Sequence, residues 1–428
     1  MTLVVPYESD AKEEPTRRQT MRRGLRLGLT LGDQAVVSGT NFLSNVMLAK
    51  ALAKPELGVY GMAFAGLLFA TEAVHALVST PHQVLLARRD KAERSIFNGS
   101  ALTHALGVGL LVSGIVAIVA LAGGGTTFAT LAAMAWAVLL RYFVRVFCFT
   151  TGTPGWALPL DVITSVIQLG GIWILWQTGN LSATTALLTL GTANVVSASV
   201  VLLARRREFR IQWHRVLADL SATWSLSRWI FASGIVWTVG THGYPLLIGV
   251  VRDKSSAGIW FACYGLAAIA NPLLMGITNS LGPAVANRAA SGSASDLERF
   301  VGIASLAFAG VMSVYATAAF FLGEWMLQLL YDDKYAGFGN VVGIMALVSI
   351  VHALGFASSR GLFALDAARP DFVANILALG VMLGAGTWLT WSFGIRGAAV
   401  AMVLSVATGN VYRIVCFFRR VREKAGEA

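Results

Sequence analysis

The chain has 428 residues, of which 56% are hydrophobic and 13% are charged, and its mean hydropathy is +0.67. A soluble domain of this length cannot hide so much apolar surface, so the composition excludes a soluble protein and indicates a polytopic membrane protein. The net charge of +11 follows the loops between apolar segments, so it reflects membrane topology and we expect no nucleic-acid partner.

Twelve apolar runs have the length of about 20 residues that crosses the hydrocarbon core of a bilayer. They predict transmembrane helices near residues 27–49, 57–79, 97–122, 127–149, 157–178, 181–204, 229–250, 258–280, 300–322, 337–359, 372–393 and 395–417. The expected fold class is therefore an all-α integral membrane protein with twelve transmembrane helices.

The basic residues, lysine and arginine together, are concentrated in every second loop. One set holds only six of the 33: Lys50, Lys54, Arg252, Lys254, Lys334 and Arg396. The other loops and both ends of the chain hold the remaining 27. The positive-inside rule therefore places both termini in the cytoplasm, which requires an even number of spans. The first 26 residues lack a short apolar run with a cleavage site, so we expect no cleavable signal peptide.

The two halves of the chain resemble each other. At an offset of 200 positions Asn41 matches Thr241, and at a later offset of 215 Arg145 matches Arg360. Such a duplication predicts two six-helix bundles in the same orientation, related by an axis along the membrane normal. The expected parts are a basic cytoplasmic segment (1–26), an N-terminal bundle (27–204), a basic cytoplasmic linker (205–228), a C-terminal bundle (229–417) and a cytoplasmic tail (418–428).

The first predicted helix carries a narrow polar stripe. Gln34, Ser38, Asn41 and Asn45 lie at i, i+4, i+7 and i+11, which puts them on one helical face. In the second half, Thr238 and Thr241 occupy the positions of Ser38 and Asn41. Such a face turns to partner helices or to water rather than to lipid. Two interpretations stay open: interhelical hydrogen bonding, or a substrate-lining surface.

Ionisable residues inside the spans are more informative, because each costs about 2.5–3.5 kcal/mol at a helix centre. Four are candidates for ion coupling: Asp33, Glu72, His75 and Asp161. Glu72 and His75 lie one turn apart, so we expect them to be able to share a proton or a hydrogen bond. For Glu72 a role facing a cavity is favoured, whereas Asp33 fits equally well as a partner of the helix dipole.

Three arginines lie near the cytoplasmic ends of their helices. Arg141 and Arg145 are one turn apart in the fourth predicted helix, and Arg360 is the repeat counterpart of Arg145. For Arg145, Arg360 and Asp161 the simpler interpretation is snorkelling to the nearby interface. Arg141 lies deeper, which favours a functional position.

Sequence motifs for catalysis are missing. The chain has no Gly-Lys-Ser/Thr phosphate loop, and its six histidines are scattered. The pair Asp332-Asp333 sits in a short loop, where a solvated turn is the better interpretation. Cys148, Cys263 and Cys416 each lie alone in a predicted span. We therefore expect no enzyme activity, no cofactor and no metal site.

Two prolines interrupt helices in the second half. Tyr244-Pro245 falls in the seventh predicted helix and Asn271-Pro272 in the eighth. A proline inside a helix frees backbone carbonyl groups and permits bending. These positions are either static kinks or hinges for movement between the halves.

Four pieces of the sequence carry a family resemblance. They are Asp33-Gln34 through Asn41-Phe42 to Leu57-Gly58-Val59-Tyr60; Arg88; Gly323-Glu324-Trp325 with Leu329-Leu330-Tyr331 and Tyr335; and Gly394-Ile395-Arg396-Gly397-Ala398-Ala399. With the duplication, the chain from about Leu25 to Arg420 resembles the polysaccharide-transporter, or lipid-linked oligosaccharide flippase, branch of the multidrug/oligosaccharidyl-lipid/polysaccharide (MOP) superfamily.

The resemblance implies two bundles around a central cavity lined by the first and seventh helices. It implies alternating-access transport of an undecaprenyl-pyrophosphate oligosaccharide to the outer leaflet of a bacterial inner membrane, for polysaccharide biosynthesis. Arg141, Arg145 and Arg360 would then attract the pyrophosphate. Membrane lipids, H⁺ or Na⁺ and polysaccharide-assembly proteins are the other implied partners.

Two alternative functions stay open. The superfamily's drug/cation antiporters use a buried acid in the first or seventh helix, and Asp33 fits the first of these positions. The seventh predicted helix has no acid between Trp229 and Val251, which counts against a cation-coupled multidrug exporter. The other alternative is a non-transporting membrane scaffold of glycan assembly.

Overall fold

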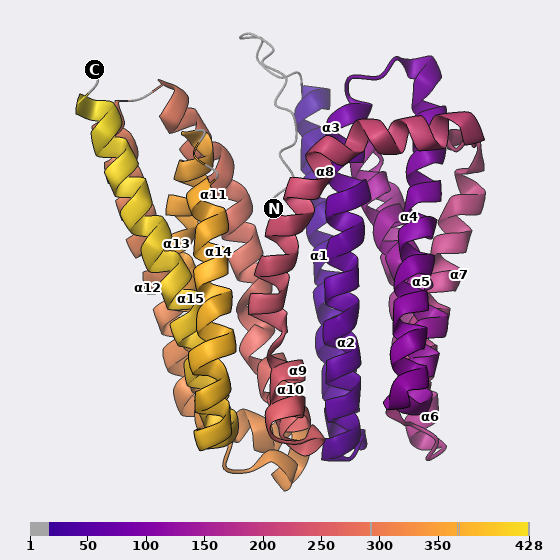
Figure 1. The fold of residues 1–428 in the computed structure, drawn as a ribbon, viewed down its shortest axis with the longest axis vertical. Helices are drawn as coiled ribbons and strands as arrows, with labels where there is room; N and C mark the ends of the chain where they lie inside the picture. Colours follow the sequence, from indigo (N-terminus) through magenta and orange to yellow (C-terminus); the bar gives the residue numbers. More distant parts are fainter. Residues whose placement is uncertain (1–16, 292, 366, 368, 427–428) are drawn as a thin grey trace. The chain divides into compact units, whose positions relative to one another are not determined.

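The structure is a computed structural model that describes residues 17–291, 293–365, 367 and 369–426 (Figure 1). All regular elements within these ranges are helices. The chain divides into two compact units, one ending at Leu246 and the other beginning at Leu247. Each unit is described by itself.

The first unit contains eight α-helices, counted within the described residues up to Leu246. They are α1 (Arg17–Ala51), α2 (Lys54–Val74), α3 (Thr80–Leu86), α4 (Lys91–Val119), α5 (Gly125–Thr150), α6 (Ala157–Gln177), α7 (Ala183–Ala204) and α8 (Trp213–His242). A π-helical turn, His75–Ser79, joins α2 to α3. Helix α5 contacts α2, α4 and α7, and its side chains Leu139, Phe143 and Phe147 belong to the buried core of the unit. Helix α1 packs on α6.

The second unit is also helical. Its α-helices are α10 (Lys254–Ala267), α11 (Asn271–Ser291), α12 (Ala294–Tyr331), α13 (Gly339–Ala364), α14 (Arg369–Val381) and α15 (Thr387–Gly426), and α9 (Tyr244–Val251) crosses the boundary between the units. Helix α13 packs between α12 and α15, and α15 also contacts α14. Side chains from α11, α12, α13 and α15 meet in one core cluster around Val301, Leu362 and Phe417.

Two glycines reverse the chain inside continuous helical stretches. Gly123 has φ 109° between α4 and α5, and Gly394 has φ 62° within α15. These left-handed conformations cost glycine little because it has no Cβ. The helical stretch Lys91–Thr150 has 60 residues and would be about 90 Å long if straight, three times the thickness of a hydrocarbon core. It is therefore a hairpin that crosses twice, with α4 packed against α5 (Figure 1). The same argument applies to Arg369–Glu423.

The described residues include eight helical stretches that are long and apolar enough to cross a membrane, and the pair Ser227–His242 and Tyr244–Val251, bent by 55°, makes a ninth. Two of these are the hairpins. Helix α1 is long enough but less apolar, because Asp33, Gln34, Asn41 and Asn45 interrupt it. The expected all-α fold of twelve transmembrane helices is confirmed, whereas the boundaries of the two predicted bundles and the cavity stay predictions.

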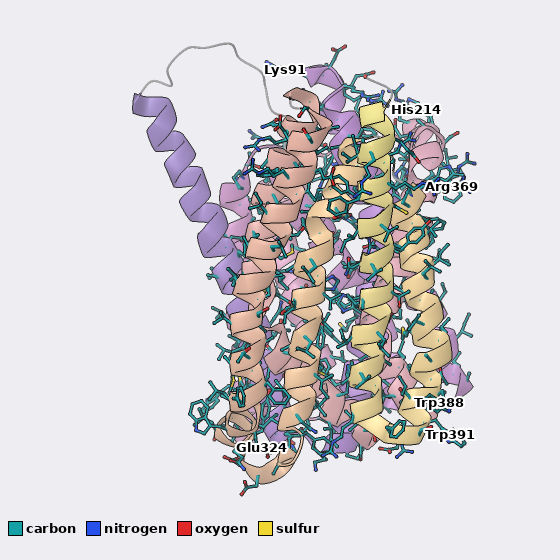
Figure 2. The ribbon with its side chains drawn as sticks, turned by 90° about the vertical axis from the view of Figure 1, so that its left-hand side faces the viewer. Lys91, His214, Glu324, Arg369, Trp388 and Trp391 are labelled. Atoms are coloured by element: carbon teal, nitrogen blue, oxygen red, sulfur yellow. The ribbon has the colours of Figure 1, made fainter. Side chains whose placement is uncertain are left out.

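Aromatic residues gather at one end of the second unit. Figure 2 shows Glu324, Trp388 and Trp391 at this end and Arg369 at the opposite end. Trp388 and Trp391 are exposed, as tryptophans at a membrane–water interface are. In the first unit, Lys91 and His214 both lie toward the upper end in Figure 2.

The segment predicted as a linker is ordered and packed on the first unit. A 3₁₀ turn, Arg206–Glu208, leads into α8. Asp219 of α8 accepts a hydrogen bond from Ser100 Oγ of α4 (2.7 Å) and pairs with Arg89 (3.2 Å). The first turns of α8 are therefore fixed against α4, while Trp213 and Trp224 remain exposed.

Candidate functional site

The first helix has two polar faces, and only one of them was identified from the sequence. On the predicted stripe Gln34 Nε2 donates to Ser38 Oγ (3.3 Å), and Asn41 is exposed. Gln34, Ser38 and Asn45 are half-buried.

The second face, Asp33, Thr40 and Ser44, is buried against α6. Thr40 Oγ1 donates to Ser165 Oγ (2.6 Å), and Gln168 Nε2 donates to Ser44 Oγ (2.9 Å). These three residues have the spacing i, i+7 and i+11, so the same helical periodicity could have found them.

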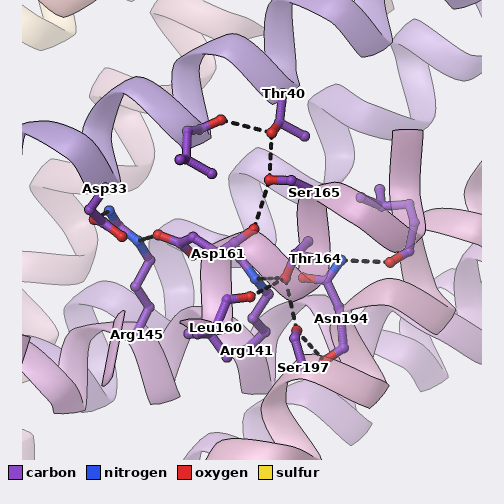
Figure 3. A network of polar contacts seen from close by, with 12 residues as sticks. Asp33, Thr40, Arg141, Arg145, Leu160, Asp161, Thr164, Ser165, Asn194 and Ser197 are labelled. Atoms are coloured by element: carbon purple, nitrogen blue, oxygen red, sulfur yellow. Dashed lines mark hydrogen bonds and ion pairs between the residues drawn. The ribbon is translucent and has the colours of Figure 1, made fainter. Parts of the chain in front are cut away.

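Four charged side chains from α1, α5 and α6 form one buried network (Figure 3). Asp161 accepts hydrogen bonds from Arg141 Nη2 and from Arg145 Nε (2.7 Å), and Arg145 Nη2 also pairs with Asp33. The side chains of Asp161 and Asp33 are only 0% and 2% exposed, and those of Arg141 and Arg145 are 17% and 25% exposed. Two carboxylates thus balance two guanidinium groups. We call Asp33, Arg141, Arg145 and Asp161 the charge network.

Hydroxyl groups extend the charge network toward α7. Arg141 Nε donates to Thr164 Oγ1 (2.8 Å), which lies 2.8 Å from Ser197 Oγ (Figure 3). The guanidinium group of Arg145 also lies 5.2 Å from the ring centroid of Phe149. One buried atom of the network, Asp33 Oδ1, has no hydrogen-bond partner in the described chain. These contacts hold both arginines in place, and Asp33 Oδ1 remains without a donor among the described residues.

The snorkelling interpretation is wrong for Arg145 and Asp161. Both residues are held inside the first unit by each other rather than extended to the interface. The physical reason is that opposite charges on neighbouring helices can share a low-dielectric site when further hydrogen bonds complete them. Sequence spacing alone did not show that α5 and α6 bring these residues together.

Glu72 and His75 do not share a hydrogen bond. His75 Nδ1 lies 2.9 Å from the Tyr142 hydroxyl and His75 Nε2 lies 3.3 Å from Thr80 Oγ1, so both ring nitrogens have other partners. Glu72 is half-buried and its carboxyl group lies against Gly234 of α8. The expected pairing fails because His75 begins the π-helical turn, where Tyr142 of α5 takes its ring.

In the second unit, Arg360 is half-buried and stacks 4.6 Å from the ring centroid of Phe356. It forms no ion pair with any residue that the structure describes, and its buried Nε atom has no hydrogen-bond partner there. Sequence reasoning missed a neighbouring cluster of Ser359, Asp371, Asn375 and Arg413. Arg413 Nε donates to Asp371 Oδ1 (2.7 Å), as does Ser359 Oγ (2.8 Å).

The two units share a local pattern that could have revealed this cluster. Asp161 lies in the first turns of α6, and Asp371 lies in the first turn of α14. Each aspartate binds arginine from another helix of its own unit. The fifth and eleventh predicted helices are repeat counterparts, so an aspartate at the start of both was a usable signal.

The two helix breaks lie where the prolines predicted them. The seventh span bends by 55° between His242 and Tyr244, and α10 ends in a 3₁₀ turn before Pro272. The hydroxyl of Tyr315 lies 2.9 Å from the Ala267 carbonyl oxygen, which the break has freed. Of the α8 candidates, Thr238 is buried and Thr241 is half-buried.

Across the described residues, no group of three or more His, Cys, Asp or Glu side chains is placed to hold a metal ion. The cysteines Cys148, Cys263 and Cys416 are free thiols.

No family model matches the chain, and no curated protein matches it. Solved structures do. An inward-facing multidrug resistance MATE family transporter of the MOP superfamily aligns with a TM-score of 0.73 and 11% identity over 91% of this chain and 95% of that one. The lipid II flippase MurJ aligns with a TM-score of 0.72 and 13% identity over 94% and 90%. A Vibrio cholerae MATE transporter, VcmN, aligns with a TM-score of 0.62 and 15% identity over 94% and 98%.

The chain therefore has the fold of these MOP-superfamily transporters along nearly its whole length. At such low identity the likeness establishes the fold alone. It does not separate the polysaccharide branch from the multidrug branch, since MATE transporters and MurJ align about equally well.

Proposed function

We propose that this chain is a transporter of the bacterial inner membrane, with both termini in the cytoplasm. By alternating access it moves a lipid-linked oligosaccharide of the undecaprenyl-pyrophosphate type from the cytoplasmic to the outer leaflet. The shared fold with a lipid II flippase supports transport as the class. Polysaccharide-assembly proteins are its expected partners.

The observation that carries the substrate class is the state of Arg360. Its guanidinium group has no carboxylate partner among the described residues, whereas Arg413 in the same unit is paired with Asp371. An uncompensated cation near the end of a membrane span either reaches water or binds an anion. A pyrophosphate group offers the oxygen acceptors that a guanidinium group binds best.

The charge network supports the same proposal. Arg141 and Arg145 each use Nε and Nη2 within the network, and the Nη1 groups of both form no hydrogen bond with the described residues. Both side chains are partly exposed, so these N–H groups remain able to donate to a phosphate oxygen. The aspartates then position the arginines rather than compete for the substrate.

A cation-coupled multidrug exporter is the second candidate. It is favoured by the likeness to MATE transporters and by the unpartnered Asp33 Oδ1, an acceptor available to a proton or cation. The ion pair between Asp33 and Arg145 argues against it, because a bound guanidinium already balances this carboxylate.

A leaflet assay in proteoliposomes tests the proposal. It follows how far a fluorescent undecaprenyl-pyrophosphate oligosaccharide is protected from an external reagent, with and without a proton or sodium gradient. We expect protein-dependent flipping, and we expect Arg360→Gln to slow it about tenfold or more, the loss of one charge-assisted hydrogen bond. Arg419→Gln, in the exposed pair with Glu423, is the matched control.

Efflux of a cationic dye without flipping of any glycan would overturn the proposal in favour of the exporter. Full flipping by Arg360→Gln would remove Arg360 from the substrate site.

A further inference from the structure

Glu72 is an ionisable side chain in a membrane helix, and it is not part of the charge network. It lies in α2, is half-buried, and has no hydrogen-bond or ion-pair partner among the described residues. A carboxylate in this position is costly unless something neutralises it. By contrast, the two aspartates of the charge network are each paired with an arginine.

The surface that faces Glu72 is the backbone of α8. A Cβ atom on Gly234 would lie 2.8 Å from the Glu72 carboxyl carbon and 3.1 Å from its Cγ, so any larger residue there would displace the Glu72 carboxyl group. Helix α8 has no ionisable side chain from Trp229 to Thr241, and Arg228, just before this stretch, lies over the Trp229 ring, 5.6 Å from its centroid. An ionised carboxyl group has nothing to pair with here, whereas a protonated one is neutral.

The charged and titratable groups on the neighbouring elements are already engaged. His75 is bound to Tyr142 and Thr80, and Arg145 of α5 is held by Asp33 of α1 and by Asp161 of α6. On α4, His104 Nε2 lies 2.9 Å from the Val216 carbonyl oxygen. For any of these groups to pair with Glu72, it would first have to break one of the contacts just described.

The contact between α2 and α8 also contains an irregular backbone segment. The π-helical turn His75–Ser79 begins three residues after Glu72, and the Leu77 carbonyl oxygen in this turn accepts a hydrogen bond from Ser227 Oγ of α8 (3.3 Å). Single π-helical turns occur often at functional sites, where they adjust the packing of a helix. Helix α8 is also the helix that bends after His242.

We propose that Glu72 is a proton-binding site of this transporter, separate from Asp33 and the charge network. The proton is bound while α2 packs against α8 as in this structure. Release of the proton leaves an anion that requires water, so the carboxylate is stable only once α8 has moved away from α2. The inference rests on the proposed function in one respect, that the chain is a transporter that works by alternating access.

Infrared difference spectroscopy of the full chain in lipid tests the site without any substrate. Over a pH titration we expect a carbonyl band of a protonated carboxyl group that disappears as the pH rises. The band should be lost in Glu72→Gln and kept in Asp33→Asn. Glu72→Asp retains a carboxyl group and should restore a band, which controls for misfolding of the glutamine variant.

A distance measurement tests the movement. Spin labels at the exposed positions Ala53, at the start of α2, and Trp237 of α8, in a background without the three cysteines, report the separation of the two helices. We expect the distance to lengthen as the pH rises in the parent chain and to stay short at every pH in Glu72→Gln.

Three results would overturn the proposal. The band could be unchanged in Glu72→Gln, the distance could respond equally to pH in both proteins, or the distance could change with sodium at constant pH. If the band and the movement are present but no glycan is flipped, the proton site stands and the proposed substrate is wrong.

Discussion

Asp161 binds two arginines from one neighbouring helix, and its removal affects both. In Asp161→Asn, Arg141 loses its one carboxylate partner among the described residues of the first unit. Breaking a buried pair in this way costs about 3–5 kcal/mol, because an uncompensated charge remains buried. We expect this loss in the free energy of unfolding, measured by denaturation in mixed micelles.

A double-mutant cycle separates this effect from a general loss of packing. The variant Arg141→Gln/Asp161→Asn should be less destabilised than the sum of its single variants, because no unpaired charge is left behind. Glu423→Gln removes an exposed pair and should leave stability unchanged. Additive effects of Arg141→Gln and Asp161→Asn would contradict the network as described.

At the residue scale, the sequence identified the charged side chains inside the spans but did not predict what they contact. Asp33, Arg141, Arg145 and Asp161 all stood out as charges inside apolar spans. Their pairing did not, because it depends on α1, α5 and α6 meeting in space. The buried face of Thr40 and Ser44 was overlooked because single hydroxyl groups are common in membrane helices and carry little signal.

At the element scale, the space around a glycine decides what alanine does there, and Gly234 of α8 and Gly39 of α1 give opposite predictions. Gly234→Ala places a methyl group against the Glu72 carboxyl group, which must shift, and should destabilise the protein by about 1 kcal/mol. Gly39→Ala in α1 meets no atom within 4 Å and should stabilise it slightly, since alanine favours the helix by about 0.5–1 kcal/mol. Thermal denaturation in detergent measures both, and equal effects would contradict the contact.

The break between α10 and α11 gives a second prediction at this scale. Tyr315→Phe removes the hydroxyl group that satisfies the Ala267 carbonyl group, at a cost of about 1 kcal/mol. Hydrogen exchange should then become faster at the amides around the break, Ala268–Ala270, and stay unchanged in α13. Unaltered exchange at the break would show that Tyr315 does not hold it closed.

The twelve helices themselves were predictable from apolar length alone, because a bilayer imposes nearly the same length on every span. Their irregularities were only partly predictable. Pro245 and Pro272 marked two breaks correctly, since proline lacks the amide that a helix needs. The π-helical turn at His75–Ser79 has no comparable marker, because it arises from the packing of α2 against α5 and α8.

For the whole molecule, the topology in the membrane follows from the distribution of lysine and arginine over the loops and from the two places where a glycine reverses the chain. The glycines at 123 and 394 turn continuous helical stretches into hairpins, and both turns belong to the set of loops that holds only six of the 33 lysines and arginines. If the termini are cytoplasmic, residues 124, 179 and 394 lie on the outer side, and residue 207 lies on the inner side.

Reporter fusions check this arrangement directly. Alkaline phosphatase joined after Gly124, Gly179 or Gly394 should be active, because the enzyme folds only outside the cytoplasm, and it should be inactive after Arg207. Green fluorescent protein at the C-terminus should fluoresce. An inactive fusion at Gly124 beside an active one at Gly179 would mean that α4 and α5 do not both cross, and the even number of spans would then need another pair of helices. Activity at all four positions would instead contradict the positive-inside assignment, because Arg207 lies among six arginines of residues 205–228.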